Sequence, residues 1–272
     1  MTDLCVRLVG AVAVGRDGSW HTGRELGSRK ARTLVALLGV QRGQPACTAR
    51  IVEALWGDSP PRRPAANIAT MVSRLRAVVG PDLVAGGRGG YRLGDSVHTD
   101  LGDAVAMLSD AQALLAAGFP ARASAAANRA LALLGDGVTG DLVGVPVGVS
   151  GGDVVLTDQP DTAWTQAARV VHRELLRQSR HTAAKAALRV ADHTTAVARG
   201  RAAVAADPFD EAAYRILMRA HWAAAEPGRA LRVYERLRTT LARELGCDPS
   251  RTTQDLHVAI LRANCGYGEL SA

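Results

Sequence analysis

The stretch that decides the fold is Pro64-Ala-Ala-Asn-Ile-Ala-Thr-Met-Val-Ser-Arg-Leu-Arg-Ala-Val-Val-Gly80, followed by Leu83-Val-Ala-Gly-Gly-Arg-Gly-Gly-Tyr-Arg-Leu93. A glycine and a proline separate the two parts, and they are expected to end a helix. Two short strands, 83–84 and 91–93, then predict a tight hairpin around a glycine-rich tip. The helix prediction rests on apolar residues spaced by four, three and four positions, which is the period of an amphipathic helix: Ile68, Val72, Leu75 and Val79.

The predicted helix has a polar face opposite this apolar stripe. Asn67 and Arg74 are side chains of the kind that hydrogen bond adenine and guanine edges bidentately in the major groove, and Thr70 and Met71 can contact a thymine methyl group. At the hairpin tip Arg88 stands between glycines, so nothing bulky prevents it from entering a minor groove. The pattern predicts a base-reading helix with a wing beside it. An ordinary surface helix and hairpin with solvated arginines would give the same pattern.

The charge distribution favours the nucleic-acid interpretation. Residues 1–95 contain 14 Lys and Arg against 7 Asp and Glu, whereas residues 96–272 contain 19 of each. The whole net charge of +7 therefore belongs to the first third of the chain. A basic domain joined to a neutral one is the electrostatic footprint of a protein that binds a polyanion.

Several function classes lack their sequence signatures. The chain has no GxxxxGK[ST] phosphate loop, no HExxH metal motif and no CxxC pair among its four cysteines. We therefore expect no catalytic residue, no metal and no cofactor. No apolar run is long enough for a membrane span, and the start of the chain lacks a signal peptide pattern, so a cytoplasmic protein is expected.

The order of elements before the helix predicts a winged helix-turn-helix. Alternating apolar residues on both sides of the turn signal Asp17-Gly18 predict a small antiparallel sheet over residues 4–22. Ser28 is expected to cap a first helix and Thr48 a second one. A turn over residues 57–63 then leads into the amphipathic helix that begins at Pro64.

The second part of the chain predicts a helical bundle. Residues 101–134 form two helical patterns that are broken at 118–120, and residues 163–206 form a long alanine-rich pattern with a break near either Arg180 or Asp192. Alanines at helix contacts and Asp-Pro between helices resemble tetratricopeptide pairs, without a clean repeat. Residues 135–161 are rich in Gly, Val and Asp, and an extended loop is expected there.

Two sets of motifs carry a family resemblance. In order and spacing, three early motifs resemble the OmpR-class winged-helix domain: Ala54-Leu-Trp-Gly57, Val72-Ser-Arg-Leu-Arg76 and Gly89-Gly-Tyr-Arg-Leu93. Three later motifs are similar to the bacterial transcriptional activator domain: Arg236-Leu237, Leu241-Ala-Arg-Glu-Leu-Gly-Cys-Asp-Pro249 and Leu256-His-Val-Ala-Ile-Leu-Arg262. Together, over about residues 4–264, the chain resembles the Streptomyces antibiotic regulatory protein family.

The resemblance implies a mainly α fold with small β elements. A winged helix-turn-helix over residues 1–96, with its antiparallel sheet and wing hairpin, precedes a tetratricopeptide-like transcriptional activator domain over 97–264 and a tail over 265–272. It also implies an activator of a specialised-metabolite (antibiotic) gene cluster. Such an activator binds direct repeats in double-stranded promoter DNA. Two protomers sit side by side on the repeats and form a homodimer on DNA. The activator then recruits RNA polymerase through its sigma and alpha subunits.

The expected DNA contacts fall into three groups. Base edges are assigned to the helix face of Asn67, Thr70, Met71 and Arg74, and the minor groove to Arg88. The side chains expected at the DNA backbone are Arg29, Lys30, Thr48, Trp56, Arg62, Arg63, Arg76 and Tyr91. Two alternatives remain open: an adaptor that binds proteins through the helical bundle with the basic domain as a nucleic-acid tether, and a repressor that acts by occlusion.

Overall fold

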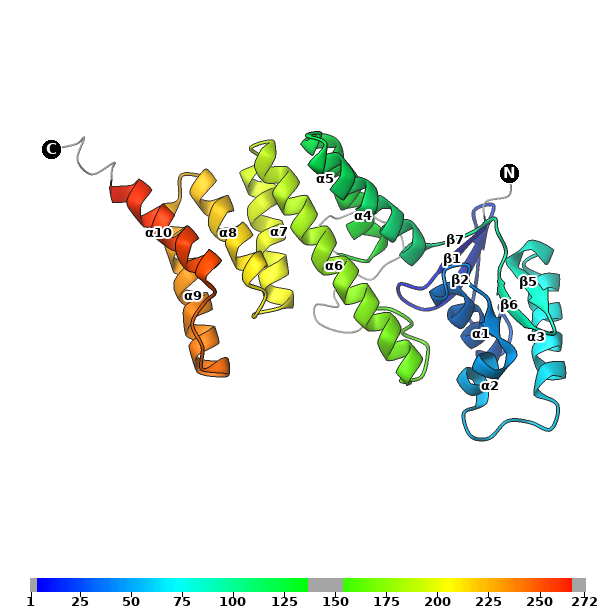
Figure 1. The fold of residues 1–272 in the computed structure, drawn as a ribbon. Helices are drawn as coiled ribbons and strands as arrows, with labels where there is room; N and C mark the ends of the chain where they lie inside the picture. Colours follow the sequence, from blue (N-terminus) through cyan, green and yellow to red (C-terminus); the bar gives the residue numbers. More distant parts are fainter. Residues whose placement is uncertain (1–3, 137–153, 266–272) are drawn as a thin grey trace. The chain divides into compact units, whose positions relative to one another are not determined.

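The computed structural model describes residues 4–136 and 154–265, and the chain divides into two compact units (Figure 1). Met1–Ala106 and Ala132–Glu174 belong to the first unit, and Met107–Leu131 and Leu175–Ala272 to the second. Within the described ranges, no helix combines the length and the apolar character that a membrane span requires.

A four-stranded sheet begins the first unit. Strands β1 (Leu4–Arg7), β2 (Ala13–Arg16) and β3 (Ser19–Thr22) pair antiparallel, as predicted. Strand β7 (Val97–Thr99) joins β1 in parallel, which gives the order β3-β2-β1-β7. The expectation of a purely antiparallel sheet is therefore wrong at this edge, because a strand from far along the chain pairs there.

Three helices form the core of the first unit: α1 (Arg29–Val40), α2 (Thr48–Trp56) and α3 (Pro64–Val78). The hydroxyl of Ser28 caps α1 as predicted, accepting from the Ala31 amide at 3.2 Å. The predicted Thr48 cap is wrong: Cys47 occupies the N-cap position without a side-chain hydrogen bond, and Thr48 is already helical. The fully buried side chains of these helices include Leu34, Leu38, Ile51, Ile68 and Leu75.

The wing is the hairpin of β5 (Val84–Gly87) and β6 (Gly90–Leu93), which are joined by two residues. The short strand β4 (Ala46–Cys47) pairs with β6, so the second sheet has the order β4-β6-β5. Leu83 was expected in the first wing strand, but it ends the short 3₁₀ helix η1 (Pro81–Leu83). Proline fits the first turn of such a helix, which delays the strand by one residue.

A buried carboxylate joins the sheet to the start of α4 (Asp100–Ala116). One oxygen of Asp100 accepts from the backbone amides of Leu8 at 2.8 Å and Val9 at 2.7 Å, and the other accepts from the Leu101 amide at 2.8 Å. Burial raises the pKa of Asp100 to about 6, although the three amides and the nearby Arg7 act in the opposite direction. The carboxyl therefore stabilises the junction through hydrogen bonds at the cost of desolvation.

Residues 154–159, here called the strap, return to the first unit. They fall in the predicted loop over 135–161, of which 137–153 lies outside the described residues. The backbone amides of Leu156 and Thr157 each donate, at 2.9 Å, to carbonyls in the connection between β1 and β2. The expected extended conformation is wrong for most of the strap: Val155 forms an isolated β-bridge, but residues 156–159 form a turn in which the Gln159 amide donates to the Leu156 carbonyl at 3.0 Å. The strap still satisfies backbone groups of that connection.

Polar side chains fix the strap to the sheet and to α1. The carboxylate of Asp158 accepts from the Val12 amide at 3.1 Å and from Nε of Arg32 at 3.2 Å. The amide oxygen of Gln159 accepts from the Thr33 hydroxyl at 2.7 Å in a buried position. Since Arg32 and Thr33 belong to the first helix of the winged-helix core, the strap is an integral part of the first unit.

The remaining helices agree closely with the sequence pattern. Helices α4 and α5 (Pro120–Leu133) separate at the predicted break. Helix α6 (Ala163–Arg189) continues through Arg180, and the break before α7 (His193–Ala206) comes at Asp192. The Arg180 alternative is wrong because no glycine, proline or cap interrupts the helix there, whereas the Asp192 carboxylate caps α7 by accepting from the Thr195 amide at 3.0 Å.

In the second unit, α7, α8 (Glu211–Ala223), α9 (Pro227–Leu245) and α10 (Arg251–Cys265) stack as successive neighbours (Figure 1). A core cluster that includes Tyr214, Leu217 and Leu237 lies between α7, α8 and α9. Glu211 ties α8 to the start of α10 by accepting from the backbone amide of Ser250 at 3.0 Å. The result is a mainly helical unit built from consecutive helix pairs.

Candidate nucleic-acid interface

Helix α3 is buried on the predicted side. Ile68, Val72 and Leu75 are at most 2% exposed. Asn67, Thr70 and Arg74 are exposed on the side away from them; we call these three residues the reading face. Met71 is half-buried at the border between the two sides, because it lies next to the buried stripe on the helix surface. The Thr70 hydroxyl donates to the Ala66 carbonyl at 3.0 Å, so its methyl group and its oxygen lone pairs remain for contacts outside the helix.

The tip of the wing is held by its backbone while its charged side chain stays free. The Thr48 hydroxyl donates to the Arg88 carbonyl at 3.2 Å, so Thr48 fixes the wing against the start of α2. The guanidinium of Arg88 makes no hydrogen bond or ion pair with any described residue. A side chain added at Gly87 or Gly89 would meet nothing within 4 Å. The tip therefore combines a fixed backbone, open surroundings and an unpaired cation.

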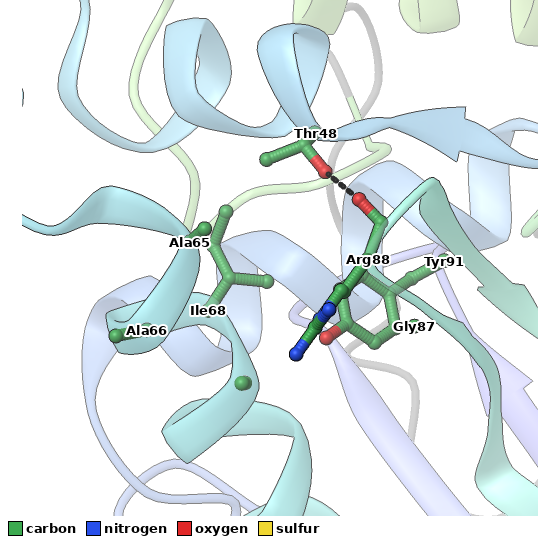
Figure 2. A pocket seen from close by; sticks show the side chains of 8 residues that line it. Thr48, Ala65, Ala66, Ile68, Gly87, Arg88 and Tyr91 are labelled. Carbon is green, nitrogen blue, oxygen red and sulfur yellow. Dashed lines mark hydrogen bonds between the residues drawn. The ribbon is translucent and has the colours of Figure 1, made fainter.

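A shallow groove of about 230 Å³ separates α3 from the wing (Figure 2). Figure 2 shows Arg88 and Tyr91 on the wing side, opposite the alanines of α3. Tyr91 is 8% exposed, so it forms part of the groove wall, and little of it is available as the DNA-backbone contact expected from the sequence. The groove is lined by Thr48, Ala65, Ala66, Ile68, Ala69, Gly87, Arg88 and Tyr91.

Arg76 has a different environment from the other arginines of α3. Its Nε and one terminal nitrogen both donate to the Val84 carbonyl at the base of the wing, at 2.9 and 2.7 Å. The sequence assigned Arg76 to phosphates because its spacing places it beside the reading face. That spacing could not reveal the partner of Arg76, because the partner is a backbone carbonyl on the far side of a turn.

Arg16 is a second arginine whose role the sequence did not reveal. From β2, it donates to the Val79 carbonyl at the end of α3. A Cβ atom at the next residue, Gly80, would lie 1.7 Å from this guanidinium, and Gly80 also has a φ of +134°. The backbone conformation favours glycine here, and any other residue would displace the Arg16 guanidinium from its hydrogen bond.

The remaining basic candidates lie near the other end of α2. Lys30 places its ammonium 4.9 Å from the centre of the Trp56 ring, which is a cation–π contact. Trp56 ends α2 and Thr48 begins it, so about 12 Å of helix separates this contact from the wing tip. Arg29, Arg62 and Arg63 are exposed, and none of them has a side-chain partner among the described residues.

The site has the electrostatics of a surface for polyanions. Acidic residues are absent from the whole of α3 and from both wing strands. In β6, Arg92 forms an ion pair with Asp95, and this pairing lowers the pKa of the Asp95 carboxyl. Among the described residues, no group of three or more His, Cys, Asp or Glu could hold a metal ion. Helix α3 and the wing strands therefore present positive charge with no acidic residue of their own.

Comparison with known proteins identifies the family. Residues 99–261, well over half of the chain, match the bacterial transcriptional activator domain. The chain belongs to the Streptomyces antibiotic regulatory protein family, which contains this domain. The regulatory protein AfsR of Streptomyces coelicolor is 33% identical over 95% of this chain, but the match spans only 25% of AfsR. The regulatory protein DnrI of Streptomyces peucetius is 27% identical over 88% of this chain and 86% of its own length.

A solved member of this regulatory family shares the fold. The structure of Mycobacterium tuberculosis EmbR in complex with a low-affinity phosphopeptide matches 97% of this chain and 66% of the EmbR chain, with a TM-score of 0.79 and 26% identity. The mainly helical fold with small sheets is thus shared with a transcriptional regulatory protein. The family consists of regulators and not of enzymes.

Proposed function

We propose that this chain is a sequence-specific DNA-binding transcriptional activator of a specialised-metabolite gene cluster. The observation that carries the proposal is that one compact arrangement exposes the reading face of α3 and the unpaired Arg88 of the wing. The groove between α3 and the wing is lined on the helix side by Ala65, Ala66 and Ala69, so the reading face lies on a different side of α3 from the groove. The net charge of +7 in residues 1–95 supplies the attraction to the duplex. In this arrangement α3 enters the major groove and Arg88 enters the adjacent minor groove.

The finer parts of the proposal come from the family. We infer that the protein binds direct repeats in promoter DNA as side-by-side protomers and recruits RNA polymerase through its sigma and alpha subunits. The turn over residues 57–63 suits the polymerase contact because nearly all of it is exposed and it begins at the end of α2 away from the wing. A polymerase bound there leaves the groove between α3 and the wing available to DNA.

A substitution on the reading face tests the DNA-binding part. Arg74→Ala is expected to weaken binding of the cognate duplex by about 1–3 kcal/mol and to relax the preference at one base position, because one bidentate base contact is lost. Fluorescence anisotropy with single-base variants of the duplex measures both effects. Arg243→Ala is the matched control, since this exposed arginine lies in α9 and is expected to leave binding unchanged.

Other outcomes point to the alternatives. Equal binding of cognate and scrambled DNA by the full chain would favour an adaptor with a nucleic-acid tether. Specific binding combined with lower transcription from the promoter in vitro would indicate a repressor by occlusion.

A further inference from the structure

One side chain, that of Arg76, hydrogen bonds α3 to the wing. Within residues 4–136 and 154–265, the two hydrogen bonds from Arg76 to the Val84 carbonyl are the side-chain hydrogen bonds between α3 and the hairpin. The other attachments of the wing lead elsewhere: Thr48 holds the Arg88 carbonyl from α2, and β4 pairs with β6. Backbone continuity through η1 and apolar packing also join α3 to β5, and Arg76 adds the side-chain hydrogen bonds at this junction.

The geometry of Arg76 argues against a phosphate contact by its bidentate edge. A guanidinium binds phosphate or carboxylate best with two parallel N–H groups. In Arg76 one of the two edges that can form such a pair, the side-on edge through Nε, already donates twice to one carbonyl oxygen, and the side chain is half-buried. Arg74, two positions earlier, is exposed and has no side-chain partner among the described residues.

We propose that Arg76 is a positioning residue that fixes the distance between the reading face and Arg88, so that both engage adjacent grooves of one duplex at the same time. This proposal rests on the proposed DNA-binding function. The groove spacing of a duplex is fixed, so two reading elements gain from each other only if the protein already holds them at that spacing. Without Arg76 the wing must be ordered during binding, and the cost of this ordering offsets the binding free energy that the Arg88 contact contributes.

A mutant cycle on the full chain tests this coupling. Arg76→Met keeps the apolar stem and removes the donors, and Arg88→Ala removes the wing contact. The probe is the duplex that the wild-type chain selects from random DNA. We expect Arg76→Met to raise the Kd about tenfold. In the Arg88→Ala background the same change should raise the Kd less than about twofold. The slope of log Kd against log salt should be the same for the double variant as for Arg88→Ala alone, because Arg76 itself contacts no phosphate.

Two results would overturn the proposal while leaving the proposed function intact. One is a double variant whose Kd rises by the product of the two single-variant factors, which would show that Arg76 and Arg88 act independently. The other is a salt slope that is shallower by about one in the double variant than in Arg88→Ala alone, which indicates that Arg76 itself contacts a phosphate. If the wild-type chain selects no duplex, the proposed function and this inference fail together.

Hydrogen exchange gives a readout that does not depend on DNA. Amides of β5 and β6 should exchange faster in Arg76→Met, while those at the buried positions of α2 remain protected. Arg76→Lys, which retains one donor, should give an intermediate effect and serves as the second variant if Arg76→Met does not fold. Unchanged wing exchange in a folded variant would contradict the positioning role. Arg74→Met, which changes an exposed neighbour on the same helix, is the matched control and should leave wing exchange unchanged.

Discussion

At the scale of single residues, the arginines of the first unit divide by their partners. Arg16 and Arg76 donate to backbone carbonyls and hold α3 in place, whereas the side chains of Arg74 and Arg88 have no partner among the described residues. The sequence predicted the face of α3 that carries Arg74 because helical period alone determines it. It could not separate the two kinds of arginine, because the partners of Arg16 and Arg76 are set by the tertiary fold.

Asp100 makes a pH-dependent contribution to stability. Burial raises its folded pKa to about 6, above the ordinary value of 3.8, so the folded state holds the proton more tightly than the unfolded state. The stabilising contribution of this proton linkage is fully present below about pH 4 and is lost as the pH rises through about 6. At neutral pH the loss amounts to at most about 3 kcal/mol.

This dependence is measured by comparing the wild-type chain with Asp100→Asn in urea unfolding between about pH 4 and pH 8. The free energy of unfolding of the wild type should fall relative to that of the variant as the pH rises to about 7, and the difference should then stay constant. Two curves that run parallel over the whole range would show that Asp100 does not titrate as its burial implies.

At the scale of elements, helices were predictable and their partners were not. The apolar period predicted α3, the glycine and proline breaks predicted the ends of α4 and α5, and Ser28 was correctly identified as a cap. The Thr48 cap was predicted wrongly because α2 begins one residue earlier than the pattern suggested, so Thr48 is the first helical residue and its hydroxyl donates to the Arg88 carbonyl of the wing. Strand β7 was missed in the sheet because parallel pairing between distant strands has no local signal.

The cap of α7 gives a prediction at this scale. Asp192→Ala should destabilise the second unit by about 1 kcal/mol, because the Thr195 amide loses its acceptor. Hydrogen bonds from Thr195 lower the pKa of Asp192, so the carboxylate is the capping form at neutral pH. Thermal unfolding measures the effect, and Asp192→Asn is the control that should remain near the wild type because asparagine also caps. Equal losses in both variants would assign the effect to charge.

At the scale of the whole molecule, the basic charge and the strap define the first unit. The charge excess of residues 1–95 was visible in the sequence, and the proposed reading face lies within it. The sequence indicated the strap only through the unusual composition of residues 135–161. Its contacts could not be predicted, because its partners Arg32 and Thr33 lie 126 residues away in the chain. The winged-helix core therefore depends on residues far outside its own stretch of sequence.

The contribution of the strap is measurable in the full chain. Asp158→Ala should lower the stability of the first unit by about 1–3 kcal/mol, because the Val12 amide and the Arg32 guanidinium lose a partly buried acceptor. Urea unfolding followed by hydrogen exchange in β1, β2 and α1 locates the effect. Asp95→Ala is the control: its carboxylate is exposed and pairs with Arg92 of the same unit, and such a surface pair should contribute little. If the two variants lost equal stability, the strap would be a surface feature only.

The most direct measurement is selection of bound sequences from random duplex DNA by the full chain and by an Asn67→Ala, Arg74→Ala double variant. If the exposed side of α3 reads bases, the wild type enriches a defined motif, and the variant retains the motif but loses its preference at the positions read by these two side chains. A wild-type chain that enriches no motif, or a variant that enriches an identical one, would contradict base reading by α3.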